Sequence, residues 1–312
     1  MLNIIRAGIG SSIQDAGRAG WRQYGVSSGG VMDQPAMQTA NMLVGNATGS
    51  AVVEITLGGF CAEFERDGWI ALAGAGCHAE LDGQAVWTGW RCAVKKGQRL
   101  TLSLPQRGMR SYLAVNGGYV IEEIMNSAST DLNASFGGFS GRKLQDGDRI
   151  PLGTPSREFH QPAGVRQLLW GNRVRAMPGP EYHEFSAESR EAFWRTAWRL
   201  NPQSNRMGYR LQGRQLRRDT SRDLLSHGLV PGVVQVPPGG QPIVLMADAQ
   251  TTGGYPRIAC VIEADLWHLA QLRLGEPMHF VCCTLEQALQ AKREQLRALE
   301  QMAKGLADES RS

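Results

Sequence analysis

Glycine is spread along the whole of this 312-residue chain, and it constrains the fold more than any other feature of the sequence. The chain contains 38 glycines and 14 prolines, and both residues interrupt regular elements and favour turns. Frequent turns leave room for short strands rather than for long helices. Hydrophobic residues still make up 42% of the chain, which is enough for a buried core. We therefore expect a mainly β protein with a few helices.

The length of the chain and one glycine- and proline-containing segment indicate two subdomains. A chain of 312 residues is about twice the common size of a single domain. Residues 153–164 contain glycine and proline and read as a linker. The expected subdomains are residues 1–152, which are β-rich, and residues 165–312, which end in an amphipathic helix.

A few elements are marked by local signals. Proline near the start and glycine after the end predict a helix from Asp33 to about Val44. Asp82-Gly83 predicts a β-hairpin. Residues 165–170 read as a strand and residues 186–200 as a helix. Thr284-Leu-Glu-Gln is a capping-box sequence that begins the last helix. That helix, to about Leu306, carries an apolar stripe. We expect the stripe to pack on the chain's own barrel, and the alternative is that it contacts another chain. Its residues are Leu285, Leu289, Leu296, Leu299, Ala303 and Leu306.

Composition and missing motifs exclude several classes of protein. The six cysteines form no Cys-x-x-Cys pair, so we expect no metal site. The chain begins without a signal-peptide pattern and has no long apolar run, which predicts a cytoplasmic protein with reduced thiols. Its net charge of +4 is not concentrated in a nucleic-acid-binding module. There is no Walker motif for binding ATP. There is also no Met-Lys-Met sequence, so we expect no biotin attachment on this chain.

The stretch from Gln235 to Tyr255 is the strongest candidate for a functional site. An apolar strand at 243–247 leads directly into polar side chains and two glycines. A strand that delivers acid, amide and hydroxyl groups to a flexible loop is a common way to build a site. The alternative is that these side chains only cap a turn. The polar residues are Asp248, Gln250, Thr251 and Thr252.

Six arginines lie between Asn205 and Arg222. A guanidinium group binds a carboxylate or phosphate through two hydrogen bonds, so such a cluster suits an anionic ligand. For Arg206 and Arg210, beside Tyr209, anion binding and a structural role both remain open. The others are expected to form solvated pairs with neighbouring acids: Arg217, Arg218 and Arg222 with Asp219 and Asp223.

One short unit occurs twice. Arg18-Ala-Gly-Trp-Arg22 resembles Arg206-Met-Gly-Tyr-Arg210, and each is followed by a glycine-rich loop that ends in a polar residue, Asp33 or Gln235. If the two units are related, two similar subdomains face each other, and Asp15 and Asp33 lie across a cleft from Arg206. The alternatives are that the similarity is coincidental, that Asp33 caps a helix, and that Asp15 pairs with Arg18.

Several strings along nearly the whole chain resemble the carboxyltransferase subdomain A and B family. The resemblance implies a cyclophilin-like β-barrel in at least one subdomain. The strings are Gln14-Asp-Ala-Gly-Arg-Ala-Gly, Gly29-Gly-Val-Met-Asp33, Leu113-Ala-Val-Asn-Gly-Gly, Ser127-Ala-Ser-Thr-Asp, Ser204-Asn-Arg-Met-Gly-Tyr-Arg-Leu and residues 235–255.

This family includes a 5-oxoprolinase subunit, part of urea carboxylase, and antagonists of a sporulation-kinase inhibitor. The resemblance most directly implies a subunit of an ATP-dependent 5-oxoprolinase, which opens 5-oxo-L-proline to L-glutamate. It implies B-type and A-type companion subunits, and ATP with Mg²⁺ used by the assembled complex. A regulatory protein that antagonises a histidine-kinase inhibitor and a biotin-dependent, urea-type amide carboxyltransferase are the alternatives.

The chemistry of lactam opening then suggests roles for the candidate residues. Arg206 would hold the substrate carboxylate, Asp248 would orient or deprotonate the water or amide, and Gln250, Thr251 and Thr252 would donate to the developing oxyanion. The remaining residues are expected to line the same cleft and bind substrate: Tyr209, Gln235, Asp15 and Asp33.

Overall fold

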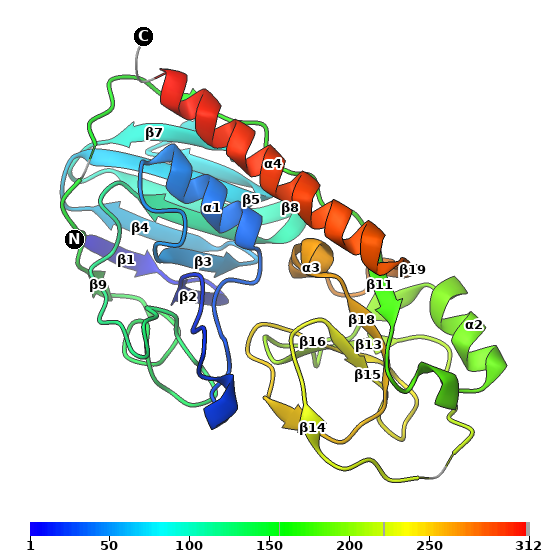
Figure 1. The fold of residues 1–312 in the computed structure, drawn as a ribbon. Helices are drawn as coiled ribbons and strands as arrows, with labels where there is room; N and C mark the ends of the chain where they lie inside the picture. Colours follow the sequence, from blue (N-terminus) through cyan, green and yellow to red (C-terminus); the bar gives the residue numbers. More distant parts are fainter. Residues whose placement is uncertain (156, 221, 310–312) are drawn as a thin grey trace. The chain divides into compact units, whose positions relative to one another are not determined.

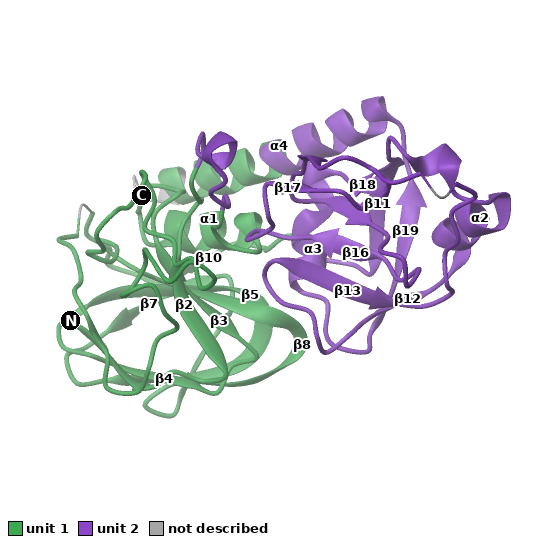
Figure 2. Ribbon diagram, turned by 90° about the horizontal axis from the view of Figure 1, so that it is seen from below, with its two compact units in different colours: residues 1–18, 29–169, 297–312 green, residues 19–28, 170–296 purple. Residues whose placement is uncertain are grey.

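The structure is a computed structural model, which describes residues 1–155, 157–220 and 222–309. The chain divides into two compact units, coloured separately in Figure 2. Each unit draws on more than one segment of the chain. Unit 1 comprises Met1–Arg18, Gly29–Leu169 and the chain from Arg297 onward, and unit 2 comprises Ala19–Ser28 and Trp170–Leu296.

Unit 1 is built on an antiparallel sheet with the strand order β10-β7-β5-β8-β4-β1-β9, to which β2, β3 and β6 add at the sides. The helix α1 (Gln34–Leu43) packs against β5 and β8 (Figure 1). The strands are β1 (Leu2–Arg6), β2 (Gly10–Gln14), β3 (Val52–Thr56), β4 (Phe60–Phe64), β5 (Gly68–Leu81), β6 (Gln84–Val86), β7 (Trp90–Val94), β8 (Arg99–Val115), β9 (Arg149–Ile150) and β10 (Ala163–Gly164).

Two features of unit 1, a hairpin and the start of α1, agree with the predictions from local sequence. Asp82 and Gly83 both have positive φ, at 49° and 82°, as the tight turn between β5 and β6 requires. The side chain of Asp33 accepts a hydrogen bond of 2.9 Å from Ala36 N, so it caps α1, and Pro35 lies in the first turn. The predicted hairpin and the predicted first helix are therefore confirmed.

Unit 2 contains a closed barrel with the strand order β11-β18-β15-β16-β13-β12-β19. The chain's mainly β character and a barrel subdomain, both predicted, are confirmed. The parallel pairing of β11 with β19 closes the barrel. The barrel strands are β11 (Arg173–Pro178), β12 (Trp198–Leu200), β13 (Gly208–Gln212), β15 (Val233–Gln235), β16 (Ile243–Leu245), β18 (Arg257–Val261) and β19 (Pro277–Cys282).

Short elements complete unit 2. The strands β14 (His227–Gly228) and β17 (Thr252–Gly253) pair with each other outside the barrel. We call this pair the β14–β17 ribbon. The helical elements are the single-turn η1 (Arg22–Tyr24), η2 (Tyr182–Glu184) and η3 (Glu263–Asp265), the helices α2 (Ala187–Arg195) and α3 (Leu266–Ala270), and the first part of α4 (Leu285–Glu309).

One predicted element of the second half is wrong, and another, the helix 186–200, is confirmed only as far as Arg195. Residues 165–170 form no strand, and the next strand after β10 begins at Arg173. The predicted helix 186–200 ends at Arg195, and Trp198–Leu200 is the barrel strand β12. Trp198 is fully buried and pairs with Met278 of β19. Burial of this large ring in the barrel outweighs any local helical preference.

The last helix begins as predicted, but its apolar stripe is used differently. Thr284 and Gln287 exchange hydrogen bonds between side chain and backbone N–H, at 2.9 and 3.2 Å, which is a capping box. Leu285, Leu289 and Leu296 are 63%, 53% and 45% exposed, so they do not pack on the barrel.

The end of α4 belongs to unit 1, which differs from the predicted subdomain of residues 165–312. Leu306 is buried in a cluster with Met37 and Ala40 of α1. The segment Ala19–Ser28 likewise joins unit 2, although it lies inside the predicted subdomain 1–152. The predicted linker includes β10, which pairs with β7 in the sheet of unit 1. Long-range packing, which no local signal reports, sets these bounds.

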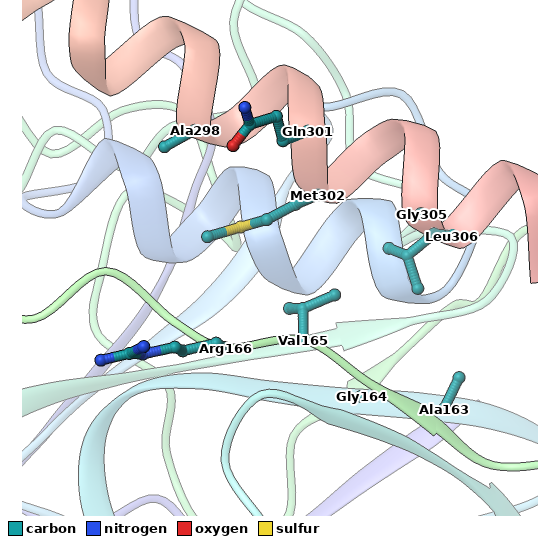
Figure 3. Close-up of a pocket in the computed structure, with 9 residues that line it drawn as sticks. All are labelled: Ala163, Gly164, Val165, Arg166, Ala298, Gln301, Met302, Gly305 and Leu306. Atoms are coloured by element: carbon teal, nitrogen blue, oxygen red, sulfur yellow. The ribbon is translucent and has the colours of Figure 1, made fainter.

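Figure 3 shows a groove in unit 1 between the end of α4 and the segment 163–166, with a volume of about 560 Å³. Its lining is mostly apolar, with Arg166 and Gln301 as the charged and amide side chains. The groove contains none of the residues that the sequence singles out for function.

Candidate functional site

The strand β16 leads into the polar loop Asp248–Tyr255, as the sequence indicates. The backbone N–H of Asp248 donates to Arg206 O at 2.9 Å, which ties the start of this loop to the segment before β13. The Asp248 carboxylate accepts from Arg206 Nε at 2.8 Å and from Nη2 at 2.9 Å. The Asp248 and Arg206 side chains are 1% and 11% exposed, respectively. Arg206 and Asp248 therefore form a buried, bidentate ion pair.

Beyond Asp248 the loop presents polar side chains to solvent. Gln250 and Thr252 are exposed and Thr251 is partly buried. Thr252 begins the β17 strand of the β14–β17 ribbon, and Thr251 O accepts a hydrogen bond of 2.8 Å from Leu229 N. The side chains that could donate to a ligand thus lie at the start of β17 and on the two residues before it.

Gln235 lies close to this ribbon and is 2% exposed. Its Nε2 donates to Tyr255 O at 3.3 Å. A Cβ atom placed on Gly253 would lie 3.4 Å from Gln235 Nε2 and 3.7 Å from Gln250 Nε2. The two amide groups therefore approach the same glycine, whose missing side chain leaves them room.

Unit 2 thus brings six predicted residues onto connected segments: Arg206, Gln235, Asp248, Gln250, Thr251 and Thr252. Tyr209 differs from them. It lies in β13 opposite Val244 and is only 1% exposed, so its side chain belongs to the barrel core.

Asp15 and Asp33 lie in unit 1, and their carboxylates are engaged there. Asp15 accepts hydrogen bonds from Ser127 Oγ, Ser129 Oγ, Ala128 N and Gly17 N, at 2.5–2.8 Å. Asp33 caps α1, which was its alternative role. Asp15 serves as a hub for a loop of serines, whereas Arg18 donates to the carbonyls of Ile124 and Ser129. Their position across a cleft from Arg206 stays a prediction.

The two Arg-x-Gly-aromatic-Arg units do not share a conformation. The first repeat, residues 18–22, reaches η1 after Gly20, whose φ is 87°. The second repeat, residues 206–210, enters the strand β13 at Gly208. Glycine permits both conformations, so the shared letters do not imply a shared structure. The interpretation as related subdomains loses its support, and a coincidental similarity is favoured.

The arginine-rich segment forms ion pairs, as one interpretation held, but with other partners. Arg218 and Arg222 both pair with Glu184, and Arg222 Nη2 lies 2.8 Å from Glu184 Oε1. Arg214 lies 3.8 Å from Glu188. These acids precede the arginines by about thirty residues along the chain, so spacing alone could not identify them.

Sequence reasoning missed three groups near the ribbon. Arg22 binds backbone carbonyls of Leu229 and Gln250. His227 of β14 donates from Nδ1 to Leu225 O at 3.1 Å, and its Nε2 is buried with no hydrogen-bond partner among the described residues. No spacing signal marks Arg22, because its two partners lie 207 and 228 residues away along the chain.

The third group is the Glu181–Arg257 pair. Arg257 donates to Glu181 through Nε at 2.7 Å, Nη2 at 2.6 Å and its backbone N at 3.0 Å. Burial alone would raise the pKa of Glu181, but these hydrogen bonds outweigh it and hold the pKa below its ordinary value. The pair anchors the start of β18 next to the end of the polar loop.

The residues that the structure describes include no group of three or more His, Cys, Asp or Glu side chains that could hold a metal ion. The carboxylates nearest the polar loop, Asp248 and Glu181, are each bound by an arginine. Nor does any helix in the described ranges have the length and apolarity needed to cross a membrane. All six cysteines are free thiols.

Comparison with known proteins identifies the family of this chain. Residues 24–282 match the model of the family described as carboxyltransferase domain, subdomain A and B. The chain belongs to this family. The predicted membership is confirmed, and the matched range covers the barrel and the polar loop.

Two relatives in the carboxyltransferase family match nearly the whole chain. The C subunit of 5-oxoprolinase from Escherichia coli (strain K12) is 62% identical over 310 residues, covering 99% of this chain and 100% of the relative. The protein of the same name from Haemophilus influenzae is 42% identical over 294 residues, covering 94% and 95%.

A solved structure is similar to this chain over nearly its whole length. The K. lactis urea amidolyase superposes with a TM-score of 0.90 at 28% identity, and the match covers 96% of this chain. It covers only 20% of the amidolyase. The carboxyltransferase-type fold therefore occurs both as a separate chain and as a part of a much larger protein.

Proposed function

We propose that this chain is a subunit of an ATP-dependent 5-oxoprolinase that opens 5-oxo-L-proline to L-glutamate. The observation that carries the proposal is the 62% identity to the C subunit of the E. coli 5-oxoprolinase, over 99% of this chain and 100% of that subunit. The name of that relative refers to a subunit, which supports a chain that acts in a complex. We propose the companions to be a B-type and an A-type subunit.

The reaction sets a clear physical requirement. A lactam is a stable amide, so its carbonyl oxygen must be activated, and the charge that develops there needs preorganised donors. Gln250 and Thr252 are exposed, and Thr251 is partly buried beside them. We assign these three residues to the developing oxyanion, with Gln235 supporting the loop through Tyr255 O.

The buried pair of Arg206 and Asp248 modifies the roles drawn from the sequence. Both carboxylate oxygens of Asp248 accept from Arg206, which favours a positioning role for Asp248 over that of a general base. We retain Arg206 as the group that attracts the substrate carboxylate, with Asp248 fixing its guanidinium. Tyr209 supports this site from within the barrel.

The substrate-binding roles predicted for Asp15 and Asp33 gain no support from their contacts. Asp15 is saturated by four donors and Asp33 caps a helix. We assign both residues a structural role in unit 1 and leave the substrate to the residues of the polar loop.

The described residues of this chain give no support for a Mg²⁺–ATP site on the chain itself. They contain no cluster of metal-ligating side chains, and the acids near the polar loop are paired with arginines. We therefore assign ATP, with Mg²⁺, to the assembled complex rather than to this chain, and we derive no step through it. We propose no biotin attachment on this chain.

Reconstitution tests the proposed function. This chain and its companion subunits should together convert 5-oxo-L-proline to L-glutamate in the presence of ATP, and omission of this chain should abolish the conversion. A deletion strain should accumulate 5-oxoproline. Unchanged 5-oxoproline with altered kinase signalling would instead support the regulatory alternative, and inhibition by avidin would support the biotin-dependent one.

A further inference from the structure

The segment Ala19–Ser28 belongs to unit 2, although the chain on both sides of it belongs to unit 1. It appears in the second colour in Figure 2. The segment contains η1, a single turn that ends at Gly25 with φ of 85°. Gly25 N donates to Arg22 O at 3.0 Å, which holds the backbone around Arg22 in a compact turn.

Arg22 joins this segment to the residues that flank the β14–β17 ribbon. Its Nη2 donates to Leu229 O and, at 3.2 Å, to Gln250 O. Its Nη1 donates to Ser28 Oγ at 3.3 Å within the same segment. One guanidinium thus holds the residue after β14 and the first exposed amide residue of the polar loop.

The ribbon needs such support. Each of its strands has two residues, and an isolated two-stranded pair is marginally stable in water. Leu229 N already donates to Thr251 O at 2.8 Å. Arg22 binds the carbonyl of the same Leu229 residue, so it reinforces the contact that sets the position of Thr251. Burial lowers the pKa of Arg22, consistent with partial exclusion of water from these contacts.

We infer that Arg22 is a positioning residue, which fixes the Gln250–Thr252 donors relative to the His227–Leu229 segment. The inference rests on the proposed function for its effect on turnover, but its structural part stands independently. Donors that stabilise a transition state act only when their geometry is held closely. A guanidinium whose Nη2 binds both carbonyls while its Nη1 binds Ser28 restricts the loop more than a single point charge does.

The test combines hydrogen exchange with kinetics on the full chain and the assembled complex. In Arg22→Ala, the Leu229 amide should exchange at least tenfold faster than in the parent, with exchange in β15 and β16 unchanged. Turnover of 5-oxo-L-proline should fall at least tenfold, and KM should change much less. Arg22→Lys keeps the charge but loses the fork, so it should give intermediate exchange and turnover.

Arg199→Ala is the matched control. Arg199 also donates to a backbone carbonyl, Gly275 O at 2.6 Å, but in the β12 region. Its loss should leave the Leu229 exchange rate and the turnover at parent values. If Arg22→Ala fails to fold, the Arg22→Lys result decides by the same criteria.

The two proposals can fail separately. Parent-like Leu229 exchange in Arg22→Ala would overturn the inference, whatever the complex does. Fast exchange in Arg22→Ala, together with a parent complex that never opens 5-oxo-L-proline, would remove the proposed function and support the structural part of the inference.

Discussion

At the scale of single residues, the Arg206–Asp248 pair is the most direct test of the site. Asp248→Asn keeps the shape of the side chain but leaves the buried Arg206 without its counter-charge. Breaking a buried ion pair costs about 3–5 kcal/mol, so we expect a clear fall in melting temperature. We also expect at least a tenfold loss of turnover per folded complex, because Arg206 loses its fixed orientation.

Two measurements separate a structural from a functional role for Asp248. Melting curves report the stability, and turnover normalised to the assembled complex reports the chemistry. Asp219→Asn, at an exposed position, is the control and should alter neither. Normal turnover by the remaining folded Asp248→Asn complex would mean that the pair is structural only, and normal values of both would refute the site assignment.

The Glu181–Arg257 pair predicts a pH dependence of stability. The pKa of Glu181 in the folded chain lies below its ordinary value of 4.5. Its contribution to stability is therefore complete above about that pH and is lost as the pH falls through the folded pKa. Glu181→Gln should be less stable than the parent by about 1–3 kcal/mol at pH 7.

Below the folded pKa, the parent carries a protonated Glu181, which resembles glutamine. The difference in free energy of unfolding between parent and Glu181→Gln should thus shrink as the pH is lowered below 4.5. Denaturant unfolding at several pH values measures it. A difference that stays constant down to low pH would contradict the account of this pair.

At the scale of elements, the apolar residues of α4 fall into a buried group and an exposed group. Leu299 and Leu306 are 8% and 7% exposed and stabilise the fold, whereas Leu285 and Leu289 are exposed. The double variant Leu285→Ser/Leu289→Ser should therefore change stability by no more than about 0.5 kcal/mol per site. We expect it to weaken association with the companion subunits, since it removes an apolar surface from the helix.

Leu306→Ala is the opposite case for α4. It should destabilise the chain by about 2–5 kcal/mol, because it leaves a cavity in the cluster around α1. Size-exclusion chromatography with the companions and thermal melts of the chain alone distinguish the two effects. Normal assembly by the double variant would show that the exposed leucines are not part of the interface.

At the scale of the whole molecule, the predicted behaviour is that of an incomplete catalytic unit. Under the proposed function the chain is one subunit of a complex, so we expect the purified chain to show no turnover of 5-oxo-L-proline with ATP and Mg²⁺. Activity should appear only when the companion subunits are added, and avidin should not reduce it. Full activity from this chain alone would refute the proposed division of the reaction among subunits.

The sequence by itself determined the features that depend on neighbours within a few residues. The cap of α1 by Asp33, the capping box at Thr284 and Gln287, and the hairpin at Asp82-Gly83 each involve partners at most three residues apart. Their hydrogen bonds and backbone angles follow from residue type. The polar loop after β16 was also visible, because an apolar strand followed by polar side chains is a local pattern.

Only the tertiary structure decided which distant residues meet. Asp248 binds Arg206, 42 residues away, and Arg22 binds Gln250, 228 residues away. The same long-range packing made Trp198–Leu200 a barrel strand and assigned Ala19–Ser28 to unit 2. Burial and ion pairing depend on contacts between residues that are far apart in the sequence. The spacing of residues along the chain does not show which of these contacts form. The sequence therefore identified the groups of the candidate site but not their partners, and the partners decide which of those groups can bind a ligand.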